Sequence, residues 1–307
     1  MSKDKTEEAR ECMEKAKKHL KTSLLKWAPD FDLAADEYAK AATCFRVGKA
    51  FKESKTCFLK ASENYLQHGS FFYAAKCLDQ AIIISKEIGD LSDVPMLALK
   101  GCHYYQQQGS AGSASLLLCK AADMLLQSDP DSAVKLLKEA SNISGSEDSF
   151  GQSMESTHKA ARLLVKLKRF EEAEEELKRQ FEMACDGGPS SNLGKVAVEL
   201  FLLQLAKEDN VAAKKVLQEY GEQYCEQSEI DMLDNLLIAY TDRDGEQIRK
   251  MLNNPFIKHM DVEFSILAKN LAEKWLVEPK EQVINITKGE DAESSEKLQI
   301  DFGGGLC

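Results

Sequence analysis

The chain has little of what several classes of protein require. It contains six prolines and 7% aromatic residues, which is unlike a β-sandwich built from many short strands and turns. No segment offers about 18 uninterrupted apolar residues. The best candidate, residues 196–206, is interrupted by Glu199 and Gln204. The first ten residues are charged and have no apolar core, unlike a signal peptide. These absences favour a soluble cytosolic protein.

The nine cysteines lack the spacing of a zinc site or a disulfide framework. They are odd in number and include no CxxC pair, and most lie in segments with helical periodicity. A free thiol in such a segment packs as a small apolar side chain. We therefore expect reduced cysteines at positions 12, 44, 57, 77, 102, 119, 185, 225 and 307.

Catalytic motifs are also missing from the sequence. There is no GxxxxGK[ST] loop, no GxSxG elbow, no HExxH and no GxGxxG between a strand and a helix. The five histidines are too scattered to act as a metal site, and the acidic run at 171–177 surrounds Ala173 and Leu177 like the solvent side of a helix. We expect no enzyme activity, no cofactor, no metal and no small-molecule substrate.

Charge is distributed unevenly along the chain. The total is −11, which does not favour nucleic acid as a partner. Residues 1–60 hold 14 Lys and Arg against 10 Asp and Glu, a balance of +4, whereas residues 201–307 hold 12 against 21, a balance of −9. Such a chain can address two partners of opposite sign, although two solvated faces without partners would give the same pattern.

What the sequence does contain is an internal repeat. A small residue followed four positions later by a large apolar one recurs at intervals of about 20 or 40 residues, and weaker versions occupy the skipped positions near 94, 153 and 193. Five phenylalanines (31, 51, 71, 150 and 170) lie three residues before such a position. The pairs are Ala34/Tyr38, Ser54/Phe58, Ala74/Leu78, Ala114/Leu118, Ala133/Leu137, Ala173/Leu177 and Ala213/Leu217.

The repeat predicts an all-α fold. A spacing of four residues places each pair on one helix face, and the small member allows a neighbouring helix to approach closely. One helix with its turn then takes about 20 residues, as in a slightly lengthened tetratricopeptide (TPR) array. We expect a right-handed superhelical solenoid of TPR-like antiparallel helical hairpins.

The rhythm is lost after about residue 228, which suggests a change of architecture. We expect a TPR-like solenoid over 1–228 and a C-terminal helical bundle over 229–277. Residues 278–307 carry seven acidic and three basic residues and end in an apolar tip, so we expect an acidic flexible tail.

An apolar loop ringed by lysines lies near the N-terminus. Leu24, Leu25 and Trp27 stand among Lys18, Lys21 and Lys26. An anionic bilayer surface attracts this combination through apolar burial and electrostatics. The alternative is that these residues pack as core beneath the first helical hairpin.

These segments carry a family resemblance. The family's YLKTGFLKW-type loop appears as HLKTSLLKWAPDFD (19–32), followed by AADEYAKAA (34–42), NNPFIKHMD (253–261) and a terminal GGGLC (303–307). In these segments the chain resembles the soluble NSF attachment protein (SNAP) family, most closely its gamma form. The resemblance covers essentially the whole chain and is weakest at 278–300.

The resemblance implies an adaptor of the membrane fusion machinery. Members of the family bind SNARE complexes through a basic solenoid surface and recruit the hexameric ATPase NSF, which disassembles the complex for reuse. The implied partners are the SNARE complex, the NSF hexamer and an anionic membrane surface, and the implied location is peripheral on membranes. The alternative is a helical-repeat scaffold in trafficking without ATPase coupling.

The resemblance also assigns roles to individual residues. The apolar loop matches the membrane-attachment site, and Leu306 matches a penultimate leucine that helps to stimulate the ATPase. On the SNARE-facing surface, Lys159 matches a basic position and Arg162 lies one turn away, whereas Leu116 stands where the alpha form has a lysine. The acidic NSF-facing surface aligns with 236–247, where Asp242 keeps an acidic position and Asp244 and Glu246 are candidate substitutes.

Overall fold

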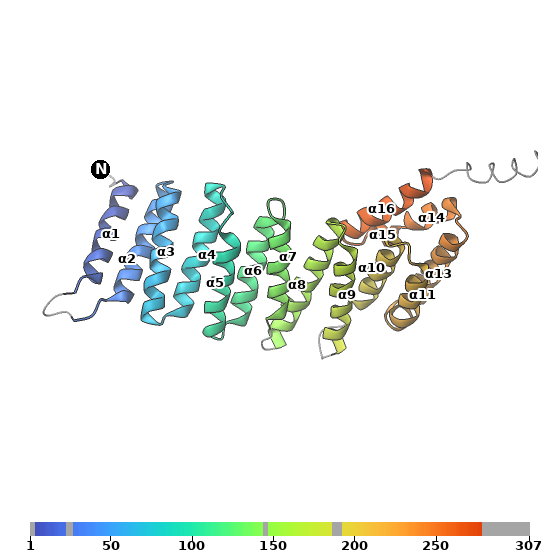
Figure 1. Cartoon of the computed structure of the whole chain (residues 1–307), viewed down its shortest axis with the longest axis horizontal. Helices are drawn as coiled ribbons and strands as arrows, with labels where there is room; N and C mark the ends of the chain where they lie inside the picture. Colours follow the sequence, from blue (N-terminus) through green and yellow to red (C-terminus); the bar gives the residue numbers. More distant parts are fainter. Residues whose placement is uncertain (1–3, 23–26, 144–146, 186–191, 278–307) are drawn as a thin grey trace, which may run out of the picture. The chain divides into compact units, whose positions relative to one another are not determined.

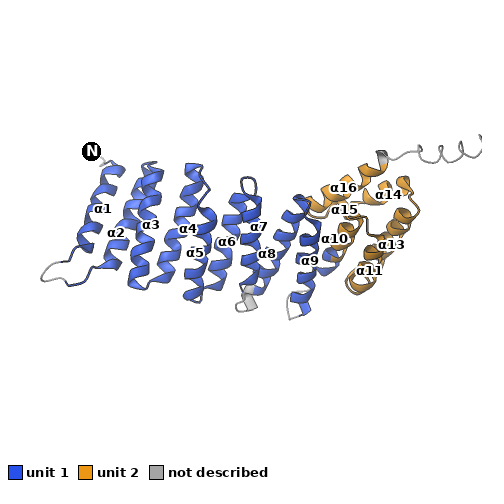
Figure 2. Cartoon of the chain, in the orientation of Figure 1, with its two compact units in different colours: residues 1–196 blue, residues 197–307 orange. Residues whose placement is uncertain are grey.

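The structure is a computed structural model that describes residues 4–22, 27–143, 147–185 and 192–277. All the regular elements within these ranges are helical (Figure 1). The chain divides into two compact units between Val196 and Ala197 (Figure 2). The predicted all-α helical-repeat fold is confirmed.

The first unit is a row of antiparallel helices in which each helix packs against the next (Figure 1). Its helices are α1 (Lys5–Leu20), α2 (Phe31–Val47), α3 (Phe51–His68), α4 (Phe71–Ile88), α5 (Val94–Gln107), α6 (Ala111–Leu125), α7 (Pro130–Asn142), α8 (Glu147–Lys166) and α9 (Phe170–Cys185). Several of the predicted repeat phenylalanines are the first residues of their helices.

The small-and-large pairs of the repeat occupy equivalent positions in successive helices. All their side chains are buried, beginning with Ala34 and Tyr38 in α2. The skipped positions near 94, 153 and 193 fall in α5, α8 and α10 (Leu193–Ala206), where Val94 and Leu193 are also buried. Each helix from α2 to α11 (Asn210–Val216) therefore has one buried residue at the repeat position, which we call its anchor.

The turns repeat with the same interval as the helices. Positive φ angles occur at Lys49 (58°), Gly69 (84°), Gly89 (80°) and Gly109 (75°), each directly after a helix or its cap. Glycine adopts this left-handed conformation freely, whereas a side chain such as that of Lys49 raises its cost by about 1 kcal/mol. The helix ends are therefore encoded locally as well as by the apolar rhythm.

Buried serines bind neighbouring helices at the points of closest approach. Ser54 Oγ in α3 donates to the carbonyl oxygen of Ala42 in α2 at 2.8 Å, and Ser62 Oγ donates to that of Ala74 in α4 at 2.9 Å. Both bonds span 12 residues in sequence. Because a buried hydroxyl needs a partner, each bond fixes the register of two helices.

Longer contacts join helices of successive hairpins. Lys55 in α3 lies 2.7 Å from the Asp93 carboxylate beside α5, and Arg169 before α9 lies 2.6 Å from Asp131 in α7. Each pair is separated by 38 residues, close to the length of one hairpin. The polar contacts thus follow the same repeat as the core.

The second unit is less regular than the first. After α10 and α11 it contains a π-helical turn η1 (Leu217–Gly221), α12 (Glu222–Tyr224), α13 (Gln227–Thr241), α14 (Gly245–Leu252), α15 (Pro255–Lys258) and α16 (Val262–Val277). Helix α13 begins two residues before the predicted bundle at 229–277, and α14, α15 and α16 lie within it.

The unit boundary and the loss of rhythm fall at different places. The repeat anchors continue through α10 and α11 into the second unit, and the regular pattern ends near the π-helical turn. The division into a solenoid to residue 228 and a bundle from 229 stays a prediction. The predicted tail, 278–307, lies outside the described residues.

The cysteines that the structure describes are free thiols, at positions 12, 44, 57, 77, 102, 119, 185 and 225. Burial raises the pKa of Cys57 and Cys102 to about 11 and that of Cys77 to about 12. These three thiols are therefore protonated at neutral pH and pack as small apolar groups. Cys307 is outside the described residues.

None of the described helices has a stretch both long enough and apolar enough to cross a bilayer.

Candidate binding surfaces

The two ends of the loop between α1 and α2 lie next to each other. The backbone N–H of Asp30 donates to the carbonyl oxygen of His19 at 3.1 Å, and His19 Nδ1 lies 4.0 Å from Asp30 Oδ2. The N–H of Lys21 donates to the carbonyl oxygen of Lys18 at 3.2 Å and ends α1. The two ends of the loop are thus joined at its base.

The described side chains in and beside this loop are mostly exposed. Trp27 is 92% exposed, and Lys18 and Lys21 are exposed as well. Trp27 is therefore not part of the core, although an indole is among the most apolar side chains. Leu24, Leu25 and Lys26 of the predicted membrane loop lie outside the described residues.

The predicted SNARE-facing residues lie on α8. Lys159 Nζ lies 3.0 Å from Glu155 Oε1 one turn earlier, and the hydrogen bond that Lys159 donates to Glu155 raises the lysine pKa. The Lys159 side chain is 36% exposed, and Arg162 is half-buried. The two cations share one side of α8, but an anionic partner must compete with Glu155 for Lys159.

Leu116 is the residue that replaces a family lysine. It lies on α6, which packs against α8, and 48% of it is exposed. An exposed leucine offers apolar area where a lysine would offer charge. At this position the exposed surface of α6 is therefore apolar.

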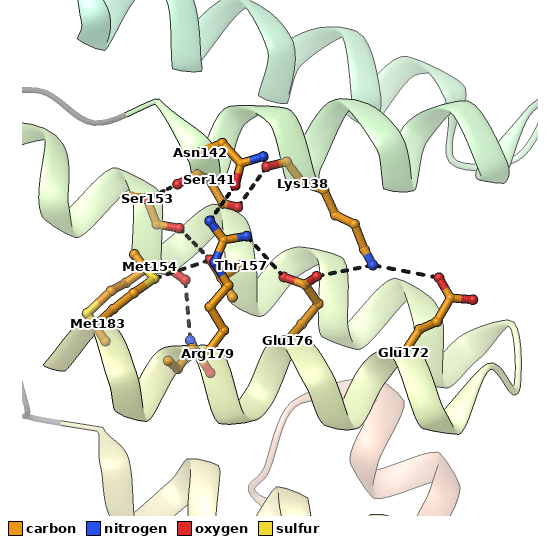
Figure 3. Close-up of polar contacts among 11 residues, drawn as sticks. Lys138, Ser141, Asn142, Ser153, Met154, Thr157, Glu172, Glu176, Arg179 and Met183 are labelled. Carbon is orange, nitrogen blue, oxygen red and sulfur yellow. Dashed lines mark hydrogen bonds and ion pairs between the residues drawn. The ribbon is translucent and has the colours of Figure 1, made fainter. Parts of the chain in front are cut away.

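A polar network joins α7, α8 and α9 beneath this surface (Figure 3). Lys138 in α7 lies 3.1 Å from the buried carboxylate of Glu176 and 3.6 Å from that of Glu172, both in α9. Arg179 in α9 donates to Asn142 Oδ1 in α7 at 2.5 Å. Acidic and basic side chains alternate along these contacts, in the order Glu172, Lys138, Glu176 and Arg179. This alternation holds α7 and α9 in one register.

Helix α8 is attached to the same network through buried polar groups. Ser153 Oγ donates to the carbonyl oxygen of Ser141 in α7, and Gln180 Nε2 in α9 donates to that of Met154 at 3.3 Å. The helix that carries Lys159 and Arg162 is therefore fixed to both of its neighbours (Figure 3).

The predicted NSF-facing acids form the turn between α13 and α14. Asp242 caps the C-terminus of α13, Arg243 adopts a positive φ of 56°, and Asp244 is the N-cap of α14. Asp242, Asp244 and Glu246 are exposed. The structure therefore brings the three acids together at one short turn, with their side chains exposed.

The two aspartates of this turn differ in their local roles. Asp244 Oδ1 accepts from the backbone N–H groups of Glu246 at 3.2 Å and Gln247 at 3.1 Å, so it stabilises the start of α14. The Asp242 carboxylate has no partner among the described residues and stands at a helix C-terminus, where the helix dipole disfavours negative charge. Asp242 therefore contributes exposed charge without a structural role.

The last described helix ends against the same turn. Trp275 in α16 meets Tyr240 edge-on with ring centroids 5.4 Å apart, and a Cβ on Gly245 would lie 3.3 Å from the Trp275 carbonyl oxygen. Lys274 pairs with Glu208 at the start of the second unit. The C-terminal end of α16 therefore lies close to the turn that carries Asp242 and Asp244. Leu306 itself is outside the described residues.

The sequence reasoning missed one exposed cluster, at the start of α4. Phe72 and Tyr73 are 39% and 53% exposed, and only Phe71 had been recognised, as a repeat position. The available signal was the run of three aromatic residues at 71–73. Because successive helix positions point about 100° apart, they cannot all face one core.

The fold and these surfaces define a class: an all-α helical-repeat protein whose distinctive residues are exposed on loops, turns and helix faces. The family model for "Soluble NSF attachment protein, SNAP" matches residues 7–255. The chain belongs to the SNAP family.

Individual relatives agree with the family model. The chain is 26% identical over 262 residues to a gamma-soluble NSF attachment protein of Dictyostelium discoideum, covering 85% of this chain and 81% of the relative. It is 25% identical over 261 residues to the Arabidopsis thaliana protein of that name, covering 84% and 90%. A crystal structure of C. therm. Get4 matches 96% of this chain and 99% of that chain at 12% identity. The TM-score of 0.27 is too low to indicate a shared fold.

Proposed function

We propose that this chain is an adaptor that binds SNARE complexes and recruits the NSF ATPase to disassemble them. The observation that supports this most strongly is the family match over residues 7–255, together with relatives named for attachment of NSF. In this proposal the chain performs no hydrolysis and holds no cofactor. It works in the cytoplasm and at membrane surfaces.

In this proposal each of three candidate surfaces binds one partner. The loop with Leu24, Leu25 and Trp27, flanked by Lys18, Lys21 and Lys26, rests on an anionic bilayer. Lys159 and Arg162 on α8 meet the SNARE complex. Asp242, Asp244, Glu246 and Leu306 meet NSF, whose contacting surface is basic.

The helix packing supports a mechanical role. An adaptor that couples a motor to a substrate must transmit force without unfolding, and a repeat array achieves this when each helix is fixed to its neighbours. The network of Lys138, Glu176 and Arg179 fixes α7 to α9 on both sides of α8. The SNARE-facing helix is thus held at a polar, register-specific junction.

A pull-down with a purified SNARE complex tests the proposal. We expect NSF to be retained only when both this chain and the SNARE complex are present. Leu306→Ala should retain both partners but disassemble the complex slowly, because only stimulation is lost. Binding of SNAREs without recruitment of NSF would instead support a scaffold without ATPase coupling.

Electrostatic recruitment has its own signature. If acids 242, 244 and 246 meet a basic surface of NSF, raising the salt concentration should weaken recruitment, because exposed charges are screened within about 10 Å at 0.1 M salt. An affinity that does not change between low and high salt would exclude this contact.

A further inference from the structure

A second apolar surface lies at the end of the first unit where α1 finishes and α2 begins. Its members are Leu33 at the start of α2 and Phe72 and Tyr73 at the start of α4, which are 48%, 39% and 53% exposed. We call this set the aromatic end. Isolated exposed apolar residues are ordinary, but neighbouring ones that share a helix end indicate a contact surface.

Contacts between helix termini show that these residues share one end. The Asp32 carboxylate at the start of α2 lies 3.7 Å from His68 Nδ1 at the end of α3. Phe71 at the start of α4 lies 6.3 Å, between ring centroids, from Tyr104 at the end of α5. The starts of α2 and α4 therefore lie at the end where α3 and α5 finish, as the alternation of the helices requires (Figure 1).

The exposed rings are held rigidly by buried ones. Tyr73 stacks on Tyr65 with centroids 5.4 Å apart, and Phe72 meets Tyr73 edge-on at 5.8 Å and Tyr105 edge-on at 5.5 Å. Tyr65 in turn donates to Asp36 Oδ1 at 2.5 Å. Rings positioned in this way lose little conformational entropy on binding, so their exposed area is available for a partner.

We propose that the aromatic end is a second bilayer contact, which enters the headgroup region of an anionic membrane beside the N-terminal loop. This inference rests on the proposed membrane attachment of the loop. Trp27, 92% exposed, belongs to the loop whose two ends meet at this end of the helices, so both surfaces belong to the same end of the first unit. Tryptophan and tyrosine favour the membrane interface because their rings combine an apolar body with a polar group.

The charges at this end allow contact with an anionic surface. Lys18 and Lys21 are exposed at the base of the loop. Three exposed carboxylates lie near these residues. Asp30 and Asp32 each face a histidine, at 4.0 Å and 3.7 Å, and Asp36 accepts from the Tyr65 hydroxyl. The apolar residues lie on the termini of two helices and a loop, an arrangement that suits a broad flat partner such as a bilayer.

Co-flotation with vesicles containing phosphatidylserine tests this contact. The double variant Phe72→Ser with Tyr73→Ser should bind vesicles about tenfold more weakly than the parent chain, because two partly exposed rings no longer enter the interface. The matched control is Val47→Ser with Met96→Ser. Both control residues are 63% exposed. Val47 ends α2 and Met96 lies in the first turn of α5, so both are at the helix ends opposite the aromatic end, and flotation should not change.

A fluorescence measurement separates a lost contact from a damaged fold. Phe72→Trp in a Trp27→Phe background should be quenched by brominated lipids, with the Trp27→Phe chain giving the background from Trp275. Absence of quenching at position 72, with Trp27 quenched in the parent chain, would overturn the inference and leave the proposed loop attachment intact.

The outcomes also distinguish this inference from the proposed function. If Leu24→Ser, Leu25→Ser and Trp27→Ser together abolish flotation while the Phe72 and Tyr73 double variant floats normally, only the aromatic end is excluded. If that double variant loses the SNARE complex but keeps vesicle binding, the surface contacts protein, and the bilayer assignment is wrong.

Discussion

The row of helices from α2 to α9 and the segment from α13 to α16 differ in how their structure is specified. In the row, a buried anchor recurs in every helix, and turns with positive φ recur at 49, 69, 89 and 109. In the second segment, helix lengths vary and particular contacts, such as Trp275 with Tyr240, determine the packing. The difference teaches that repetition sets the scaffold, while individual residues shape the turn at 242–244, which is proposed to face NSF.

The largest effect that distinguishes the two regions is expected from the repeat core. Leu78→Ala in α4, where Leu78 is 1% exposed, should lower the free energy of unfolding by about 3 kcal/mol. Because repeats contact mainly their neighbours, hydrogen exchange should accelerate in α3 to α5 and stay unchanged in α13 to α16. Leu116→Ala, at a site 48% exposed, is the control with an effect within about 0.5 kcal/mol. Uniform acceleration would show that the two regions unfold together.

A smaller effect is expected from the aromatic contact of the second unit. Trp275→Ala should cost about 2 kcal/mol, because it removes the edge-on contact with Tyr240 and the packing on Gly245. Residues 240–250 should then lose amide protection. Trp27→Ala removes the same side chain from a site 92% exposed and should leave the melting temperature unchanged. Equal losses for the two tryptophans would contradict the structural assignment.

Variants of the acidic turn can separate an effect on stability from an effect on charge. Asp244→Ala should cost about 1 kcal/mol, because it removes the N-cap of α14, whereas Asp244→Ser should keep the cap and lose only charge. Asp242→Ala should leave stability unchanged or raise it by about 0.3 kcal/mol, because it removes a carboxylate from a helix C-terminus. Thermal melts and NSF pull-downs on the three variants separate the roles. A stability loss in Asp242→Ala would refute its assignment as exposed charge.

The smallest effect is a pH dependence at the junction of α7 and α9. The hydrogen bond from Arg169 is the main reason that the Glu172 pKa lies below its usual value of 4.5. A lowered folded-state pKa gives stability that is present above pH 4.5 and is lost as the pH falls through the lowered pKa. Since the Glu172 side chain is 38% exposed, the contribution is below about 1 kcal/mol. Unfolding of Glu172→Gln should therefore depend less on pH below 4.5 than unfolding of the parent chain, and an identical dependence would contradict this.

The regular half of the fold could be predicted because its signals are local. The spacing of Ala34, Ser54 and Ala74 fixes which helix face is buried, and the glycines at 69, 89 and 109 mark where helices end. Both signals act within one helix and its turn. No knowledge of distant contacts is needed.

The binding surfaces could be predicted only in part. The sequence indicated the acids at 242, 244 and 246, but it did not show that Asp244 is bound to the backbone as a cap. It did not reveal that Glu155 pairs with Lys159, or that Phe72 and Tyr73 remain partly exposed against Tyr65 and Tyr105. These features depend on side-chain contacts, most of them between different helices. An apolar periodicity does not specify them.

The most direct test of the proposed adaptor role is ATP-dependent disassembly of a fluorescently labelled SNARE complex by NSF. With the parent chain present, we predict disassembly that requires NSF, ATP and this chain together, and that is strongly slowed by Leu306→Ala. SNARE binding by the chain without any disassembly, at concentrations that saturate the complex, would contradict the proposed coupling to the ATPase.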